Sequence, residues 1–150
     1  MADNTIAEAK KFLIFKLGNE EFGVDIHKIT TIIEKEMSIA RVPKTPSCLK
    51  GVINLRGEII PIMSLRIKFG LPEDVFKEDT RIIIVKLDEI SVGLIVDSVA
   101  EVLELDEEAT ESIANIAGEL SLDYITGVGK ANGRIITLLN LENLVSLSDS

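Results

Sequence analysis

The stretch GVINLRGEIIPIMSL, Gly51 to Leu65, is repeated in diverged form as GVGKANGRIITLLNL, Gly127 to Leu141. With no gap, both stretches read G-V-x-x-x-x-G-x-I-I-x-[IL]-[ML]-x-L. Apolar runs on both sides of a glycine-containing turn are typical of a β-hairpin. The chain is therefore predicted to be a duplication of one small folding unit.

A second pair of matching stretches lies upstream of the first. Residues 12–34 read FLIFKLGNEEFGVDIHKITTIIE, and residues 82–104, IIIVKLDEISVGLIVDSVAEVLE, align with them without a gap. Two ungapped blocks in the same order are better explained by duplication than by a chance match of apolar runs. Residues 12–65 are therefore the first copy, and residues 82–141 are the second copy.

Each copy is expected to begin with two short strands followed by a less regular segment. The strands are predicted at Phe12–Leu17 and Phe22–Ile26 in the first copy and at Ile82–Leu87 and Val92–Val96 in the second. After them, an apolar residue recurs at every third position, which indicates a helical turn or an irregular crossing rather than a plain strand. These residues are Ile26, Ile29 and Ile32 in the first copy and Val96, Val99 and Val102 in the second.

One proline sets the register of the first hairpin. Asn132-Gly133 is a strong two-residue turn, and the alignment transfers that turn to Arg56-Gly57. Val52 then pairs with Pro61 at a non-hydrogen-bonded position, where the missing N–H of proline costs no ladder bond. A type I′ turn would hold Arg56 at positive φ, at a cost of about 1–2 kcal/mol; a longer, bulged loop is the alternative. The remaining pairs are Leu55 with Glu58 and Ile53 with Ile60.

These patterns predict an all-β fold of small barrels. Short helices are expected only at Leu65–Phe69 and around Leu141–Leu147. The 150 residues, 46% of them hydrophobic, suffice for one compact domain or for two small lobes that share an interface. We expect a single domain, residues 1–150, with a first lobe at 12–80 and a second at 81–147, and the exchange of strands between the lobes stays open.

The composition favours an acidic, reduced, water-soluble protein. A formal charge of −9, from 25 acidic and 16 basic residues, argues against sequence-independent nucleic-acid binding and against an anionic membrane surface. A single cysteine, Cys48, excludes an internal disulfide and fits the cytosol. The chain contains no run long enough to cross a membrane, and its first residues, MADNTIAEAKK, read as a polar lead-in rather than a signal peptide.

The residues needed for catalysis or for a metal site are scarce. His27 is the only histidine, and no cluster of Cys and His has the spacing of a zinc site. His27 is expected at the surface or partly packed, and Cys48 is expected to be a small packed residue. Asp97 is interpreted as a cap of the segment that follows it. No catalytic residue, metal or cofactor is predicted.

Two features remain that indicate binding. Asn54 and Arg56 are polar residues in an otherwise apolar hairpin, and the planar guanidinium of arginine suits carboxylates and interfaces. An internal salt bridge of Arg56 is an equal alternative. The apolar stripe Ile26, Ile29 and Ile32 is either core, or a groove for an amphipathic helix, or a contact between the lobes.

The first hairpin also resembles a known family. Gly51 to Gly57, GVINLRG, followed by Ile59-Ile60-Pro61, is similar to the signature of the CheW family of bacterial chemotaxis coupling proteins. Further landmarks occur in the order expected of the family, and the resemblance covers about Phe12 to Leu147. The landmarks are Phe22 to Ile26, Val42-Pro43 with Pro46, Val92-Gly93 with Val96-Asp97, and Ile125-Thr126-Gly127.

The resemblance implies more than the residues alone do. It implies two SH3-like five-stranded barrels and a non-enzymatic, cytoplasmic adaptor, monomeric in isolation, that joins methyl-accepting chemoreceptors to the histidine kinase CheA in membrane-associated arrays. It implies a receptor-binding surface made of Asn54, Arg56 and the stripe Ile26, Ile29 and Ile32. It assigns no kinase-binding residue. The alternatives are a small-barrel nucleic-acid binder or another interaction module, and an enzyme with an unrecognised site around His27.

Overall fold

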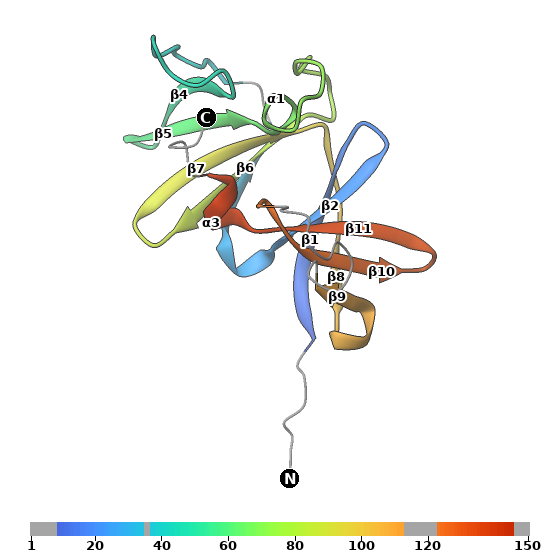
Figure 1. Cartoon of the computed structure of the whole chain (residues 1–150). Helices are drawn as coiled ribbons and strands as arrows, with labels where there is room; N and C mark the ends of the chain where they lie inside the picture. Colours follow the sequence, from blue (N-terminus) through green and yellow to red (C-terminus); the bar gives the residue numbers. More distant parts are fainter. Residues whose placement is uncertain (1–8, 35–36, 113–122, 146–150) are drawn as a thin grey trace.

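A computed structural model describes residues 9–34, 37–112 and 123–145 (Figure 1). Its strands are β1 (Lys10–Leu17), β2 (Glu20–Asp25), β3 (Ile29–Ile33), β4 (Leu49–Leu55), β5 (Glu58–Ser64), β6 (Arg81–Leu87), β7 (Ile90–Val96), β8 (Ser98–Leu105), β9 (Thr110–Ser112), β10 (Ile125–Ala131) and β11 (Arg134–Leu139). Its helical pieces are η1 (Ile26–Lys28), α1 (Leu65–Lys68), η2 (Glu107–Ala109) and α3 (Leu141–Leu144). The predicted all-β class with short helices is confirmed.

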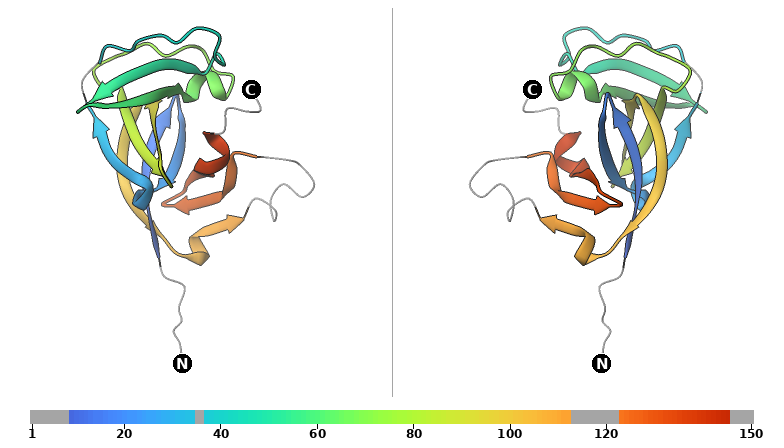
Figure 2. Two further views of the ribbon diagram at one scale, coloured as in Figure 1. Left: turned by 90° about the vertical axis from the view of Figure 1, so that its left-hand side faces the viewer. Right: turned by 90° about the vertical axis from the view of Figure 1, so that its right-hand side faces the viewer.

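The described strands form two sheets, one in each lobe. The first lobe is the five-stranded sheet β3-β6-β7-β5-β4, and the second lobe is the six-stranded sheet β8-β1-β2-β11-β10-β9. Figure 2 shows β4 and β5 at one end of the molecule and β9 to β11 toward the other. Five strands were expected in each lobe; the second has a sixth because the short strand β9 pairs with β10.

Neither sheet is built from one copy of the repeat alone. β1 and β2 of the first copy lie with β8 to β11, and β6 and β7 of the second copy lie with β3 to β5. The exchange is reciprocal, because β1 pairs with β8 as β6 pairs with β3, and β2 pairs with β11 in parallel as β7 pairs with β5. Ladders of backbone hydrogen bonds therefore join the two copies in both sheets.

The register repeats even in its irregularities. β3 has a bulge at Thr30, and β8 has one at the matching residue Ala100. β4 has a bulge at Lys50, and β10 has one at the matching residue Thr126. A bulge inserts one unpaired residue and bends the strand, so its recurrence at two pairs of matching sites supports the duplication more strongly than the sequence match does.

The segment that contains the isoleucine stripe is only partly as predicted. The helical turn is present as η1, but β3 begins directly after it, and in the second copy β8 follows β7 without a helical turn. The bulge at Thr30 explains the misleading spacing. One extra residue shifts the alternation of side chains, so Ile29 and Ile32, three positions apart, both pack on the same core.

The first hairpin has the register that Pro61 predicts. Leu55 pairs with Glu58, and Val52 pairs with Pro61. The N–H and C=O of Val52 turn to the other side, where both bond to Ala40 at 2.8 Å. Proline at this position therefore removes no bond between β4 and β5.

In both hairpins the second strand, β5 or β11, is followed by a capped helical turn. The Ser64 side chain accepts from the Ile67 N–H at the start of α1, and the Asn140 side chain accepts from the Asn143 N–H at the start of α3, both at 3.1 Å. Both predicted helices are thus confirmed at their start. The last expected residues of α3, 146 and 147, lie outside the described part of the chain, as does the lead-in at residues 1–8.

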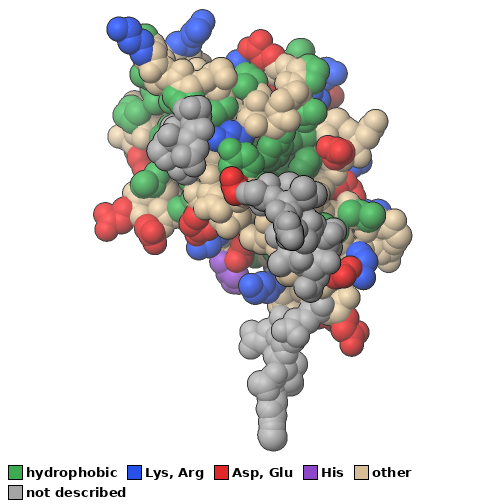
Figure 3. Space-filling model, in the orientation of Figure 1, with side chains coloured by type: hydrophobic (Ala, Val, Ile, Leu, Met, Phe, Trp, Pro, Cys, Tyr) green, Lys and Arg blue, Asp and Glu red, His purple; other side chains and the backbone are tan. Residues whose placement is uncertain are grey.

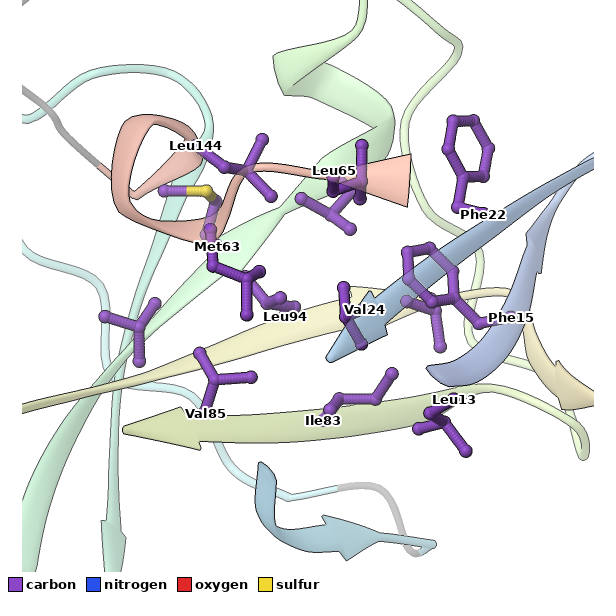
Figure 4. Close-up of a cluster of buried hydrophobic side chains, with 14 of the residues drawn as sticks. Leu13, Phe15, Phe22, Val24, Met63, Leu65, Ile83, Val85, Leu94 and Leu144 are labelled. Carbon is purple, nitrogen blue, oxygen red and sulfur yellow. The ribbon is translucent and has the colours of Figure 1, made fainter. Parts of the chain in front are cut away.

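The described residues form three clusters of buried hydrophobic side chains. One lies in each lobe, and the third, the central core, contains residues of both lobes (Figure 4). β6 contributes to two of them, because Ile82 and Ile84 pack in the first lobe while Ile83 and Val85 pack in the central core. Burial on both faces explains why this strand is a continuous apolar run.

The central core is aromatic on one side. Phe15 stacks on Phe22 and Phe22 on Phe69, each with ring centroids 5.6 Å apart, and Tyr124 follows at 6.2 Å. Phe69 and Tyr124 are half-buried. On the face of the molecule in Figure 3, hydrophobic side chains gather beneath α1. This row of rings links the end of α1 to the second lobe.

Candidate functional site

The tip of the first hairpin is a strained two-residue turn. Arg56 has φ 54° and Gly57 has φ 89°, so the type I′ turn is confirmed and the bulged loop is not formed. Positive φ costs a residue such as arginine about 1–2 kcal/mol. The Asn54 side chain offsets part of this cost, because its Oδ1 accepts from the Gly57 N–H at 2.9 Å. Such a bond contributes about 0.5–1.5 kcal/mol net.

The Arg56 side chain is exposed at this tip. The described residues provide it with no hydrogen bond and no ion pair, so the internal salt bridge is not formed within that part of the chain. Beside it, Ile59 is 60% exposed and stands opposite Asn54 in the ladder. The hairpin end therefore presents an exposed guanidinium, unpaired within the described residues, and an exposed aliphatic side chain on β5.

The isoleucine stripe is divided between core and surface. Ile29 and Ile32 are half-buried and pack against the central core, which is the lobe contact that the sequence left open. Ile26 is half-buried on η1, and within the described residues it belongs to none of the three core clusters. β3 and β4 occupy opposite edges of the first-lobe sheet, so the sheet does not bring the stripe and Asn54 together.

The second hairpin also contains an arginine, Arg134, but its guanidinium is paired with carboxylates. Arg134 on β11 donates through Nε and Nη2 to Glu21 on β2, at 2.9 and 3.0 Å, and Nη2 also lies 2.8 Å from Glu101 on β8. The hydrogen bond from Arg134 lowers the pKa of Glu21. The neighbouring Ile135 is 70% exposed. The two hairpin ends are thus alike in their exposed isoleucine and differ in whether the guanidinium is occupied.

Asp97 forms an ion pair with Arg66, a role that differs from the cap interpreted from the sequence. It caps no segment; its carboxylate accepts from Arg66 Nε and Nη2, at 2.8 and 2.5 Å, and from the Gly18 N–H at 2.7 Å. The hydrogen bond from Arg66 lowers the pKa of Asp97. The contact ties α1 to the turn between β1 and β2. Its partners are 31 and 79 residues away in the sequence, so no local pattern pointed to them.

The described side chains offer little for catalysis or metal binding. His27 is exposed and Cys48 is buried, as the sequence predicted. Within the described ranges, no three His, Cys, Asp or Glu side chains are grouped so that they could hold a metal ion. The helices of this part of the chain are also too short to span a bilayer.

Known proteins similar to this chain come from chemotaxis. The family model for the CheW-like domain matches residues 11–149. Chemotaxis protein CheW of Klebsiella aerogenes is 38% identical over 146 residues, covering 97% of this chain and 86% of the relative. Chemotaxis protein CheW of Helicobacter pylori is 33% identical over 139 residues, covering 92% and 82%. The crystal structure of scaffolding protein TtCheW from Thermoanaerobacter tengcongensis superposes with a TM-score of 0.84 at 33% identity, covering 95% of this chain and 96% of the other.

Proposed function

This chain belongs to the CheW-like domain family of chemotaxis scaffold proteins, and on that basis we propose that it is a non-enzymatic adaptor that couples methyl-accepting chemoreceptors to the histidine kinase CheA. The family match extends over nearly the whole chain. The proposal includes a cytoplasmic location at membrane-associated receptor arrays and a monomer in isolation.

The exposed Arg56 is the observation that carries the receptor contact. Its guanidinium has no partner among the described residues, whereas Arg134 on the other hairpin is paired with two carboxylates. A guanidinium is more weakly hydrated than an ammonium group, and it can contact a carboxylate with two parallel hydrogen bonds. Arg56 is therefore suited to an acidic side chain on a helical receptor tip.

The isoleucine stripe is proposed as the apolar part of the receptor-binding surface. Ile26, Ile29 and Ile32 are half-buried, so each keeps some apolar surface for a partner. An amphipathic helix presents an apolar face that can contact partly exposed aliphatic side chains of this kind. Substituting Ile26 with Lys is then expected to weaken receptor binding with little loss of stability, because Ile26 is outside the three core clusters in the described part of the chain.

The test compares two charge reversals. Arg56→Glu is expected to weaken binding to the cytoplasmic helical fragment of a chemoreceptor by about tenfold or more, since a charge-assisted hydrogen bond contributes about 1.5–3 kcal/mol. The control is Lys130→Glu, which makes the same charge change on the exposed strand end of the second hairpin, where Lys130 lies 3.7 Å from Glu111. Calorimetry gives the affinities. The thermal midpoint should hardly change in Arg56→Glu and should fall slightly in Lys130→Glu, which loses the exposed ion pair with Glu111.

Other outcomes separate the alternatives. A large loss of stability with unchanged receptor binding would make Arg56 a structural residue. No structural observation favours the nucleic-acid binder, and titrations with RNA and DNA at low salt are expected to be flat because the net charge is −9.

A further inference from the structure

The two residues of the receptor-facing motif differ in what holds them. Arg56 has no partner in the described part of the chain, while Asn54 is engaged within the hairpin through the 2.9 Å bond from the Gly57 N–H. Asn54 and Arg56 were expected to contact the receptor together. The geometry separates their roles, because the Asn54 oxygen already has a donor in the free protein.

The second hairpin has the same turn without this bond. Asn132 and Gly133 have φ values of 53° and 78°, close to those of the first turn. Asparagine tolerates this conformation better than arginine does. Lys130 stands at the position of Asn54 and has no acceptor to offer. The side-chain acceptor therefore occurs in the hairpin where an unfavourable residue occupies the turn.

The conformation of the turn sets the direction in which the Arg56 side chain leaves the backbone. A relaxed tip would let Arg56 leave positive φ, and its side chain would then depart along another direction. Fixing the backbone in the free protein lowers the ordering cost that binding would otherwise incur. It also presents the planar fork in one orientation, which bidentate pairing with a carboxylate requires.

We propose that Asn54 is a positioning residue for Arg56: it holds the turn so that the guanidinium meets an acidic side chain of the partner, and it does not itself contact the partner. The inference rests on the proposed receptor contact of Arg56. It assigns the partner's chemistry, a carboxylate on a receptor helix, and it gives different roles to Asn54 and Arg56.

A double-mutant cycle tests the inference. The full-length chain is titrated with the cytoplasmic helical hairpin of a chemoreceptor encoded in the same genome, using Asn54→Ala, Arg56→Ala and the double variant. Asn54→Ala is expected to weaken binding about two- to tenfold, and Arg56→Ala more. In the Arg56→Ala background, Asn54→Ala should add nothing, because its effect passes through Arg56.

Additive losses in the cycle would show that Asn54 contacts the receptor itself and would overturn the inference alone. Wild-type affinity of Arg56→Ala would overturn the receptor contact of Arg56 and the inference with it. Amide hydrogen exchange at Gly57 is a second measurement that does not depend on the receptor: Asn54→Ala should speed it, and unchanged exchange would count against the turn-holding bond. Lys130→Ala is the matched control and should leave affinity unchanged.

Discussion

The hairpins β4–β5 and β10–β11 have the same register, the same bulge and the same type of turn, but different residues hold the turn. In β10–β11 the turn residue Asn132 tolerates positive φ by itself. In β4–β5 the turn residue is Arg56, and Asn54 supplies a side-chain acceptor. The two copies of the repeat thus share one backbone, and a less favourable residue at the tip occurs where a neighbouring side chain supports the turn.

The central core is asymmetric between the copies in a similar way. Four aromatic residues line one side of it, and the four matching positions on the other side are small. The aromatic residues are Phe15, Phe22, Phe69 and Tyr124, and the matching residues are Val85, Val92, Val145 and Cys48. One backbone thus accommodates two packings of different volume, and the two sides should respond differently to truncation.

The largest contrast is expected from truncation at Phe22 and Val92. Phe22→Ala should lower the free energy of unfolding by about 3–5 kcal/mol, because it removes a ring that stacks on Phe15 and Phe69. Val92→Ala removes only two methyl groups and should lower it by about 1–3 kcal/mol. Urea unfolding of both variants measures the difference. Equal losses would mean that the core is not asymmetric in energy.

The matching glycines Gly51 and Gly127 provide the next contrast. A Cβ on Gly51 would lie 2.2 Å from the Ala40 carbonyl oxygen, and one on Gly127 would lie 2.4 Å from the Glu111 carbonyl oxygen. Gly51 also has φ 145°, which other residues rarely adopt. Gly51→Ala should therefore cost about 3 kcal/mol or more, and Gly127→Ala less. Denaturation midpoints check the order, and a more stable Gly51→Ala than Gly127→Ala would contradict it.

Ion pairs at the two helical turns give a third contrast. Asp97 and Arg66 keep 29% and 20% of their side chains exposed, and Asp97→Asn should lower stability by about 1–3 kcal/mol. Glu142 stands at the position of Arg66 and pairs with Lys28 at 3.4 Å in a more exposed setting. Lys28→Ala should cost under about 1 kcal/mol. Thermal unfolding at neutral pH separates the two variants.

The Asp97 pair also predicts a pH dependence. Its folded-state pKa is lowered, first by the hydrogen bond from Arg66, so its contribution is fully present above the unfolded value of about 4 and is lost as the pH falls through the folded value. The stability advantage of the wild type over Asp97→Asn should shrink below about pH 4. A constant difference from pH 7 to pH 2 would contradict the lowered pKa.

Exchanging the turn residues is expected to have small effects of opposite sign in the two hairpins. Arg56→Asn should stabilise the protein by up to about 1 kcal/mol, since asparagine tolerates positive φ. Asn132→Arg should destabilise it by about 1–2 kcal/mol, because Lys130 provides no acceptor there. For a chain of this length these changes shift the thermal midpoint by about 2–4 °C per kcal/mol. If both substitutions raised the thermal midpoint, or both lowered it, the proposed difference between the two turns would be contradicted.

Much of the fold was predictable because local rules set it. The turn at Asn132-Gly133 and the pairing of Pro61 with Val52 follow from φ preferences and missing donors within a few residues. The end of α1 was expected from Gly70 and Pro72, and its start and that of α3 follow the capping residues Ser64 and Asn140. Asn54 and Arg56 could be picked out as unusual residues, but their separate roles depend on a hydrogen bond that the sequence did not reveal.

The stripe shows why the rest was not predictable. Ile29 and Ile32 imitate helical spacing because a bulge at Thr30 shifts the strand, and a single sequence does not distinguish a bulge from a helical turn. The division of the stripe between the central core and the surface depends on which strands pack over it, and those come from the other copy.

The duplication, the all-β class, the hairpin register and the family could be read from the amino-acid sequence, because spacing, turn residues and motifs encode each of them. The reciprocal exchange of strands, the shared central core and the long-range ion pairs became visible in the folded molecule alone; Arg134 and Glu21, for example, are 113 residues apart. These two groups of features differ in the sequence separation over which the forces that set them act. Dihedral limits and backbone hydrogen bonds act over a few residues, whereas partners distant in the chain are selected by how two apolar faces pack together.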